Sequence, residues 1–193
     1  MTHLILICVI YYDNIYSIFR RLRNISCAIY RAIRYFKNDN HVLMKILFVC
    51  TANIVRSFMA ERILIERLKK DKNPGSDVSS ASIIDMHGMP VDPTAVELLD
   101  EHGFDGAGHH SKPLTEDMVS QADMIIVMEG IHKKIILDQY PEVEANIHLL
   151  KSFSPDYYEE YGDIKDPYKL SIFQYRLCFS EIYMAIDGLM KCI

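Results

Sequence analysis

Four candidate strands alternate with helical patterns along most of this chain, and that alternation constrains the fold more than any other feature. The candidate strands cover residues 45–50, 78–84, 123–129 and 146–150. Helical patterns cover residues 57–70, 94–102, 131–140 and about 170–191, and a further short helix is expected after residue 113. Nearly continuous apolar runs such as residues 45–50 are typical of strands buried on both faces of a parallel sheet. The order predicts βαβ units with right-handed crossovers, and hence an α/β, doubly wound sandwich.

Length and charge indicate one domain with an appendage. Half of the 193 residues are hydrophobic, which is enough for a sizeable core. The net charge is -5, yet residues 1–43 contain six Lys or Arg and only two Asp or Glu, so residues 44–193 are clearly acidic. Binding of nucleic acid needs clustered basic side chains to neutralise phosphates. We therefore expect no nucleic-acid partner.

The N-terminal 43 residues have a different character from the rest. An apolar run at residues 3–12 is followed by a basic stretch, which is the reverse of the order in a secretory signal, and it is too short to span a bilayer. Residues 15–36 fit a basic amphipathic helix that contacts an anionic membrane surface or a partner. The interpretation that we favour is an adventitious extension upstream of Met44, with the domain at residues 44–193.

The sequence Val49-Cys-Thr-Ala-Asn-Ile-Val-Arg56-Ser has the pattern C-x5-R-S between a predicted strand and a predicted helix. A loop at a helix N-terminus directs backbone N–H groups and the positive end of the helix dipole at one point, where they stabilise a thiolate or a phosphate. Cys50 is the candidate nucleophile, since a thiolate attacks phosphorus. Arg56 is the candidate phosphate clamp, because its planar fork binds two oxygens. The predicted phosphate-binding loop also includes Thr51, Ala52, Asn53, Ile54, Val55 and Ser57.

Two polar residues of this loop have expected supporting tasks. The Ser57 hydroxyl is suited to donate a hydrogen bond to the Cys50 thiolate, which assists its formation and departure. Asn53 tolerates the left-handed backbone conformation that a tight anion-binding loop requires. The pattern C-x5-R-S becomes specific through its position between a buried strand and a helix.

The segment 49–61, VCTANIVRSFMAE, resembles the active-site loop of the low-molecular-weight protein tyrosine phosphatases. The resemblance covers about residues 45–190 and includes Ser80-Ala81, the strand at 123–129 and Asp166-Pro167-Tyr168. It implies a central four-stranded parallel sheet flanked by helices. It further implies hydrolysis of phosphotyrosine in proteins through a cysteinyl-phosphate, with Asp166 as the general acid. No metal or other cofactor is implied.

Four positions depart from the family pattern. Ala52 and Ser82 replace frequent glycines, so the backbone at Ala52 must keep a negative φ. Val55 stands where many members have a second cysteine that protects the nucleophile, so Cys50 is expected to be more open to irreversible oxidation. Phe58 replaces a proline that gives a rigid helix start. Every residue with a chemical role is nevertheless present.

The substrate class is predicted from residues near the loop. In protein-arginine phosphatases the position of Ile54 resembles Thr, whose hydroxyl suits a phosphoguanidinium, whereas an apolar Ile54 favours the ring of phosphotyrosine. Ile54 and Tyr168 are the predicted substrate wall. Three tyrosines of the preceding loop are further candidates: Tyr157, Tyr158 and Tyr161.

Several alternatives stay open at this point. Two other enzymes that share this fold are alternatives: an arginine phosphatase and a thioredoxin-coupled arsenate reductase. A phosphate-binding module without catalysis is an alternative from another functional class. Arsenate reduction needs two further relay cysteines, and none lies between Cys50 and Cys178. The five scattered cysteines do not indicate a disulfide framework, so a reducing cytoplasm is expected. Three histidines lie close together in a Gly-rich stretch that we interpret as a flexible turn without a metal: His102, His109 and His110.

Overall fold

The structure is a computed structural model that describes residues 44–71, 76–155 and 162–193. The predictions for residues 1–43 and for Tyr157, Tyr158 and Tyr161 lie outside these ranges. Within the described part of the chain, no helix has the length and apolarity that a membrane span requires.

The centre of the domain is a four-stranded parallel sheet, as predicted. Its strands are β1 (Met44–Cys50), β2 (Ser76–Ser82), β3 (Met124–Val127) and β4 (Ile147–Leu149). The strand order is β2-β1-β3-β4, and all neighbouring strands are parallel. The order therefore reverses between β1 and β3, and ligands of such sheets bind beside this reversal at the carboxyl ends of the strands. Cys50 is the last residue of β1.

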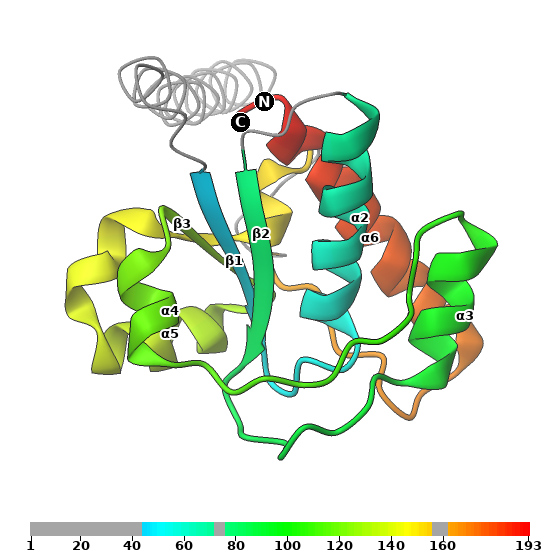
Figure 1. The fold of residues 1–193 in the computed structure, drawn as a ribbon, viewed down its shortest axis with the longest axis horizontal. Coiled ribbons are helices and arrows are strands. Elements are labelled where there is room, and N and C mark those ends of the chain that lie inside the picture. Colours follow the sequence, from blue (N-terminus) through cyan, green and yellow to red (C-terminus); the bar gives the residue numbers. More distant parts are fainter. Residues whose placement is uncertain (1–43, 72–75, 156–161) are drawn as a thin grey trace, which may run out of the picture. The chain divides into compact units, whose positions relative to one another are not determined.

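Helices cover both faces of the sheet. They are α2 (Arg56–Lys70), α3 (Pro93–Glu101), α4 (Glu116–Gln121), α5 (Gly130–Gln139) and α6 (Ile172–Met190), with 3-10 turns η2 (Pro141–Asn146) and η3 (Leu150–Phe153). Figure 1 shows α2, α3 and α6 on one side of the sheet and α4 and α5 on the other. The prediction of a doubly wound sandwich is confirmed.

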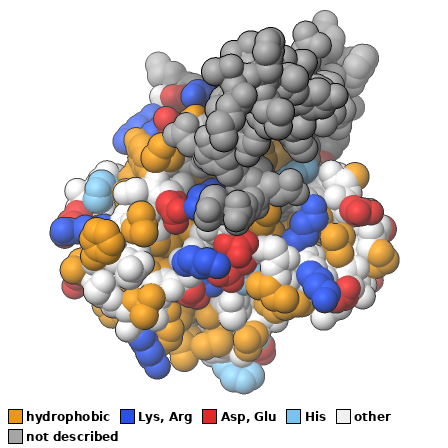
Figure 2. All heavy atoms as spheres, turned by 180° about the vertical axis from the view of Figure 1, so that it is seen from behind, with side chains coloured by type: hydrophobic (Ala, Val, Ile, Leu, Met, Phe, Trp, Pro, Cys, Tyr) orange, Lys and Arg blue, Asp and Glu red, His pale blue; other side chains and the backbone are white. Residues whose placement is uncertain are grey.

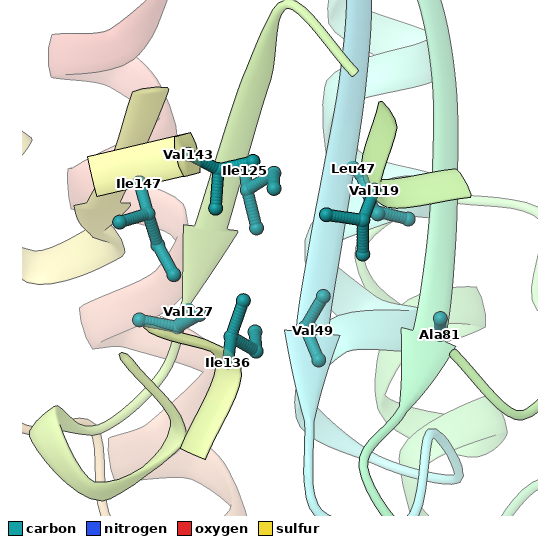
Figure 3. Packing of buried hydrophobic residues seen from close by; sticks show 9 residues of the cluster. All are labelled: Leu47, Val49, Ala81, Val119, Ile125, Val127, Ile136, Val143 and Ile147. Carbon is teal, nitrogen blue, oxygen red and sulfur yellow. The ribbon is translucent and has the colours of Figure 1, made fainter. Parts of the chain in front are cut away.

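The core beneath α4 and α5 follows from the alternation of side chains along a strand. Leu47 and Val49 of β1 point to this side, whereas the alternate residues of the strand face the layer of α2 and α6. Figure 3 shows the cluster between the sheet and these helices. Its buried members are Leu47, Val49, Ala81, Val119, Ile125, Val127, Ile136, Val143 and Ile147. Because both faces are buried, β1 and β3 are apolar throughout apart from Lys45.

The bounds of β2 differ from the prediction of residues 78–84, because it is an edge strand with a polar N-terminal half. Such a strand lacks the apolar run that marks β1 and β3. Beyond Ser82 the chain continues beside the candidate loop: the N–H of Ile83 donates to the carbonyl of Cys50 at 2.9 Å, and that of Ile84 donates to Thr51 at 3.0 Å. These bonds fix the start of the loop against the sheet.

Charged side chains are dispersed over the face shown in Figure 2. Lys and Arg side chains there lie among acidic and hydrophobic ones and do not gather into a single basic patch. The described side chains on this face therefore do not concentrate positive charge in the way that binding to a phosphate backbone requires.

Candidate active site

The Cys50 thiol lies in a polar cradle made by its own loop. Its Sγ is 3.1 Å from the Ser57 hydroxyl and accepts a hydrogen bond from the backbone N–H of Asn53 at 3.2 Å. The loop ends at the first turn of α2, so the unpaired N–H groups of that helix face the same region. Donors directed at sulfur stabilise the thiolate over the thiol. The predicted contact between Ser57 and Cys50 is present.

Asn53 is the fully buried centre of the loop. Its φ is 54°, the left-handed conformation expected from the sequence. Its side-chain amide donates to Ser57 Oγ at 2.9 Å and to Ser80 Oγ at 2.7 Å. Ser57 Oγ accepts this bond, which leaves its own proton free to donate to a Cys50 thiolate, since a thiolate can only accept. Asn53 thus orients the hydroxyl that stabilises the thiolate.

His109 and Glu61 support Asn53 from behind, and neither was predicted to be part of the site. His109 Nε2 lies 3.0 Å from Asn53 Oδ1 and is its donor, since a side-chain carbonyl only accepts. Glu61 accepts a hydrogen bond from Ser80 and lies 3.7 Å from His109 Nδ1. His109 is 5% exposed, so its side chain is part of the interior, although the Gly-rich chain beside it forms a turn at Ala107 and Gly108. Burial, the largest cause, lowers the pKa of His109 to about 4, which keeps the ring neutral near pH 7.

Arg56 is buried, with 1% of its surface exposed, and four groups surround its guanidinium. Nη1 donates to the carbonyl of Ile164 at 3.0 Å and lies 3.2 Å from Glu129 Oε1. Nη2 lies 2.5 Å from Asp166 Oδ2 and donates to Thr51 Oγ1 at 3.4 Å. These contacts orient the guanidinium before any ligand is bound.

The protonation state and the remaining donor of Arg56 both suit an anion. Burial acts to lower the pKa of Arg56, but the negative charges of the Cys50 thiolate and of the Asp166 and Glu129 carboxylates outweigh it and raise the pKa above the usual value. The buried Nε atom has no hydrogen-bond partner among the described residues. A buried donor normally has a partner, so this atom is available to a phosphate oxygen.

Asp166 comes from a distant part of the chain and meets the loop through Arg56. Its other oxygen, Oδ1, accepts a hydrogen bond from the N–H of Tyr168 at 3.1 Å, which fixes the Asp-Pro-Tyr turn. The Asp166 side chain is 39% exposed and therefore open to a substrate at the mouth of the site. Tyr168 is also 39% exposed, beside Asp166.

Glu129 is a further acidic residue that the sequence analysis did not single out. It follows the buried strand β3, next to β1 in the sheet, so both strands end at the same edge. An acidic residue at the end of the predicted strand 123–129 was the signal in the sequence. Ile54 of the predicted substrate wall is only 4% exposed, and its part in such a wall stays a prediction.

The departures from the family pattern fit this structure. Ala52 is not among the residues with positive φ, so its methyl group causes no backbone strain. Phe58 is fully buried and packs on the ring of His109, with centroids 4.8 Å apart. The buried Ser82 hydroxyl donates to the carbonyl of Lys112 at 2.9 Å. Val55 is buried at the N-cap of α2.

The remaining described cysteines lie outside this cradle. Cys178 is a buried free thiol whose pKa is raised, mainly by burial. Cys192 is also buried. No group of three or more His, Cys, Asp or Glu side chains suited to a metal occurs in the described ranges.

Comparisons with known proteins agree with the geometry. The family described as "Low molecular weight phosphotyrosine protein phosphatase" matches residues 45–193. A probable low-molecular-weight protein-tyrosine-phosphatase, EpsP, of Ralstonia nicotianae is 35% identical over 76% of this chain and 94% of that protein. A protein-arginine-phosphatase of Geobacillus stearothermophilus is 33% identical over 75% of this chain and 93% of its own length. The crystal structure of a low-molecular-weight protein tyrosine phosphatase from T. tengcongensis, 34% identical, matches with a TM-score of 0.71 over 78% of this chain and 99% of that chain. The chain belongs to the low-molecular-weight phosphotyrosine protein phosphatase family.

Proposed function

We propose that this protein hydrolyses phosphotyrosine in protein substrates with Cys50, Arg56 and Asp166 as its catalytic residues. In the first step the Cys50 thiolate attacks phosphorus, and the bond from phosphorus to the phenolic oxygen breaks. Asp166 gives its proton to that oxygen, so tyrosine leaves as the neutral phenol. The phosphoryl group is now bonded to Cys50.

The second step restores the enzyme. The Asp166 carboxylate takes a proton from water as the water oxygen attacks phosphorus, and the bond between sulfur and phosphorus breaks. The departing thiolate is stabilised by the Ser57 hydroxyl and the Asn53 N–H. Arg56 and the loop amides stabilise the charge on the phosphoryl oxygens in both steps. The products are tyrosine and inorganic phosphate.

The observation that carries this proposal is the meeting of Asp166 with Arg56, residues 110 positions apart in the chain, at 2.5 Å. Arg56 lies in the same short loop as Cys50. Nucleophile, phosphate-binding group and proton donor therefore share one site at the switch point of the sheet. A simple phosphate-binding module has no need of a carboxylate beside Arg56, because a carboxylate repels the phosphate anion.

Phosphotyrosine is the favoured substrate class. Ile54 has no hydroxyl for a phosphoguanidinium, and Tyr168, exposed next to the general acid, provides an aromatic face for a phenolic ring. The similarity to protein-arginine-phosphatases makes phosphoarginine the second candidate. Arsenate reduction ranks below both, since Cys178 is buried and its raised pKa disfavours the thiolate that a disulfide relay requires.

The test compares hydrolysis of p-nitrophenyl phosphate by the wild type and by Cys50→Ser, at mildly acid pH and with EDTA present. Activity in the wild type that is lost in Cys50→Ser is expected. A phosphotyrosine peptide and a phosphoarginine peptide are then compared at equal concentration, and faster turnover of phosphoarginine would refute the proposed substrate class. An inactive, fully reduced wild type would favour the binding module.

Two further proposals concern the context of the enzyme. We place it in the cytoplasm, where a reducing environment keeps the Cys50 thiol free. We also propose that residues 1–43 are dispensable for catalysis. A chain that starts at Met44 is expected to retain kcat/KM for p-nitrophenyl phosphate within about twofold. A much larger loss would assign these residues to the working domain.

A further inference from the structure

His132, in the first turn of α5, is a buried imidazole to which the proposed reaction assigns no task. Its exposed fraction is 2%. Nε2 lies 2.9 Å from Thr51 Oγ1, the hydroxyl of the residue after the nucleophile. Nε2 is also 3.5 Å from Glu129 Oε2. One ring nitrogen thus faces both the phosphate-binding loop and an acidic residue beside it.

These contacts belong to a closed ring of four residues that includes Arg56. Arg56 Nη2 donates to Thr51 Oγ1 at 3.4 Å, and Arg56 Nη1 lies 3.2 Å from Glu129 Oε1. His132 joins the other side of Thr51 to the second oxygen of Glu129. Removal of His132 opens this ring. Thr51 and Glu129 then each lose one of the contacts that fix their side chains.

The surroundings of His132 select one protonation state. Nε2 faces a carboxylate and a hydroxyl oxygen, so a proton there is well placed to donate. Nδ1 is buried and has no partner among the described residues, and a proton on it would leave an unpaired N–H in the interior. Burial, and after it the charge of Arg56, lowers the pKa of His132. The carboxylates of Glu129, Asp166 and Asp163 act in the opposite direction but do not outweigh these two effects. Near pH 7 the ring is therefore neutral, and the contacts favour the tautomer with its proton on Nε2.

This state determines what the Thr51 hydroxyl does. Thr51 Oγ1 accepts from His132 and from Arg56, which occupies both of its lone pairs. Its own proton is then directed elsewhere, and an oxygen of a phosphate bound by Arg56 is a suitable acceptor. With the proton on Nδ1 instead, the Thr51 hydroxyl would donate to His132 and be lost to the substrate.

We propose that His132 is a positioning residue of the phosphatase reaction, which orients the Thr51 hydroxyl and, through Glu129, the Arg56 guanidinium for the phosphoryl group. The inference rests on the proposed function, because it assigns a task within the same site. His132 itself touches neither the nucleophile nor the leaving group in this role. Its effect on the reaction passes through Thr51 and Glu129.

A double-mutant cycle between His132 and Thr51 tests the proposal. His132→Met removes the donor with little change in length, and Thr51→Val removes the hydroxyl with little change in shape. Each is expected to lower kcat/KM for p-nitrophenyl phosphate about three- to tenfold, the size of one neutral hydrogen bond. The loss in the double variant should be clearly smaller than the product of the two single losses, because both changes break the contact between His132 and Thr51.

Further measurements separate positioning from mere packing. His132→Gln and Thr51→Ser keep the donor and the hydroxyl, so each should recover most of the kcat/KM that His132→Met and Thr51→Val lose. In His132→Met the inhibition constant for inorganic phosphate should rise, since Arg56 is less well oriented. His148→Gln is the matched control for loss of a histidine imidazole on the neighbouring strand β4, and it should leave kcat/KM unchanged.

The outcomes that overturn the inference are distinct from those that overturn the function. Wild-type activity and its loss in Cys50→Ser are measured first, and failure there concerns the proposed function. With an active wild type, losses that multiply in the double variant refute the role of His132. If His132→Met does not fold, Thr51→Val decides, because wild-type kcat/KM and phosphate inhibition in that variant would equally refute it.

Discussion

At the scale of single residues, the Asp166 carboxylate has two opposite effects on a phosphate ligand. In the proposed mechanism the protonated Asp166 carboxyl group gives its proton to the leaving group, yet the ionised carboxylate is also the partner of the Arg56 Nη2 group that a phosphate needs, at 2.5 Å. Asp166→Asn should lower kcat for phenyl phosphate about 10²–10⁴-fold through loss of general acid catalysis. The loss should be smaller for p-nitrophenyl phosphate, whose better leaving group needs less protonation.

Binding of inorganic phosphate to Asp166→Asn should instead be as tight as in the wild type or tighter, measured as its inhibition constant. Asp163→Asn is the matched control, because Asp163 is a neighbouring carboxylate whose Oδ1 accepts from the Gly130 N–H at 2.8 Å. It should change kcat by less than about threefold. Equal losses in both variants would remove Asp166 from its role.

Asn53 permits a separation of backbone from side-chain effects. Both Asn53→Ala and Asn53→Gly remove an amide that hydrogen-bonds Ser57, Ser80 and His109. Both should destabilise the protein by about 2–4 kcal/mol, since buried partners lose their bonds. Because φ is 54°, alanine should be worse than glycine by about 1 kcal/mol. Urea denaturation measures both, and an alanine variant as stable as the glycine variant would contradict the strain.

At the scale of elements, the helices and strands were predicted correctly where their signal lies in residues that are neighbours in the sequence. The C-x5-R-S loop and the helix α2 are contiguous, and β1 and β3 are apolar because both of their faces are buried. The polar N-terminal half of β2 gave no such signal. His109 and Glu129 reach the site only through tertiary packing, and no local spacing relates them to Cys50. Glu61 lies on α2 itself, but its contacts with Ser80 and His109 arise only in the folded chain. Asp166 was assigned from a family resemblance for the same reason.

The start of α2 shows how one departure from the family is accommodated. Proline is compatible with the first turn of a helix, where N–H groups lack intrahelical partners, so Phe58→Pro should not break α2. Phe58 is however fully buried against His109, and Arg62 lies over its ring at 5.7 Å. Phe58→Pro should therefore cost about 3 kcal/mol of unfolding free energy, and Phe58→Leu clearly less. A proline variant as stable as the wild type would show that the ring contributes no packing.

At the scale of the whole molecule, two histidines should make the folded state sensitive to acid. Burial lowers the pKa values of His109 and His148 to about 4. The same side chains in the unfolded chain titrate near pH ~6.5. Between about pH 6.5 and 4 the unfolded state therefore binds more protons, and the free energy of unfolding decreases as the pH falls. Each histidine contributes at most about 3 kcal/mol to this decrease.

Urea denaturation at several pH values between about 6.5 and 4 measures this contribution as a slope. His109→Gln keeps a side-chain N–H that can donate to Asn53 but cannot titrate, so its unfolding free energy should depend less steeply on pH than that of the wild type. The exposed His87 provides the matched control, because its side chain is 89% accessible and His87→Gln should leave the slope unchanged. An unchanged slope in His109→Gln would mean that His109 takes up its proton without unfolding. Acid would then act on the Asn53 cradle directly, and activity would be lost while the fold persisted.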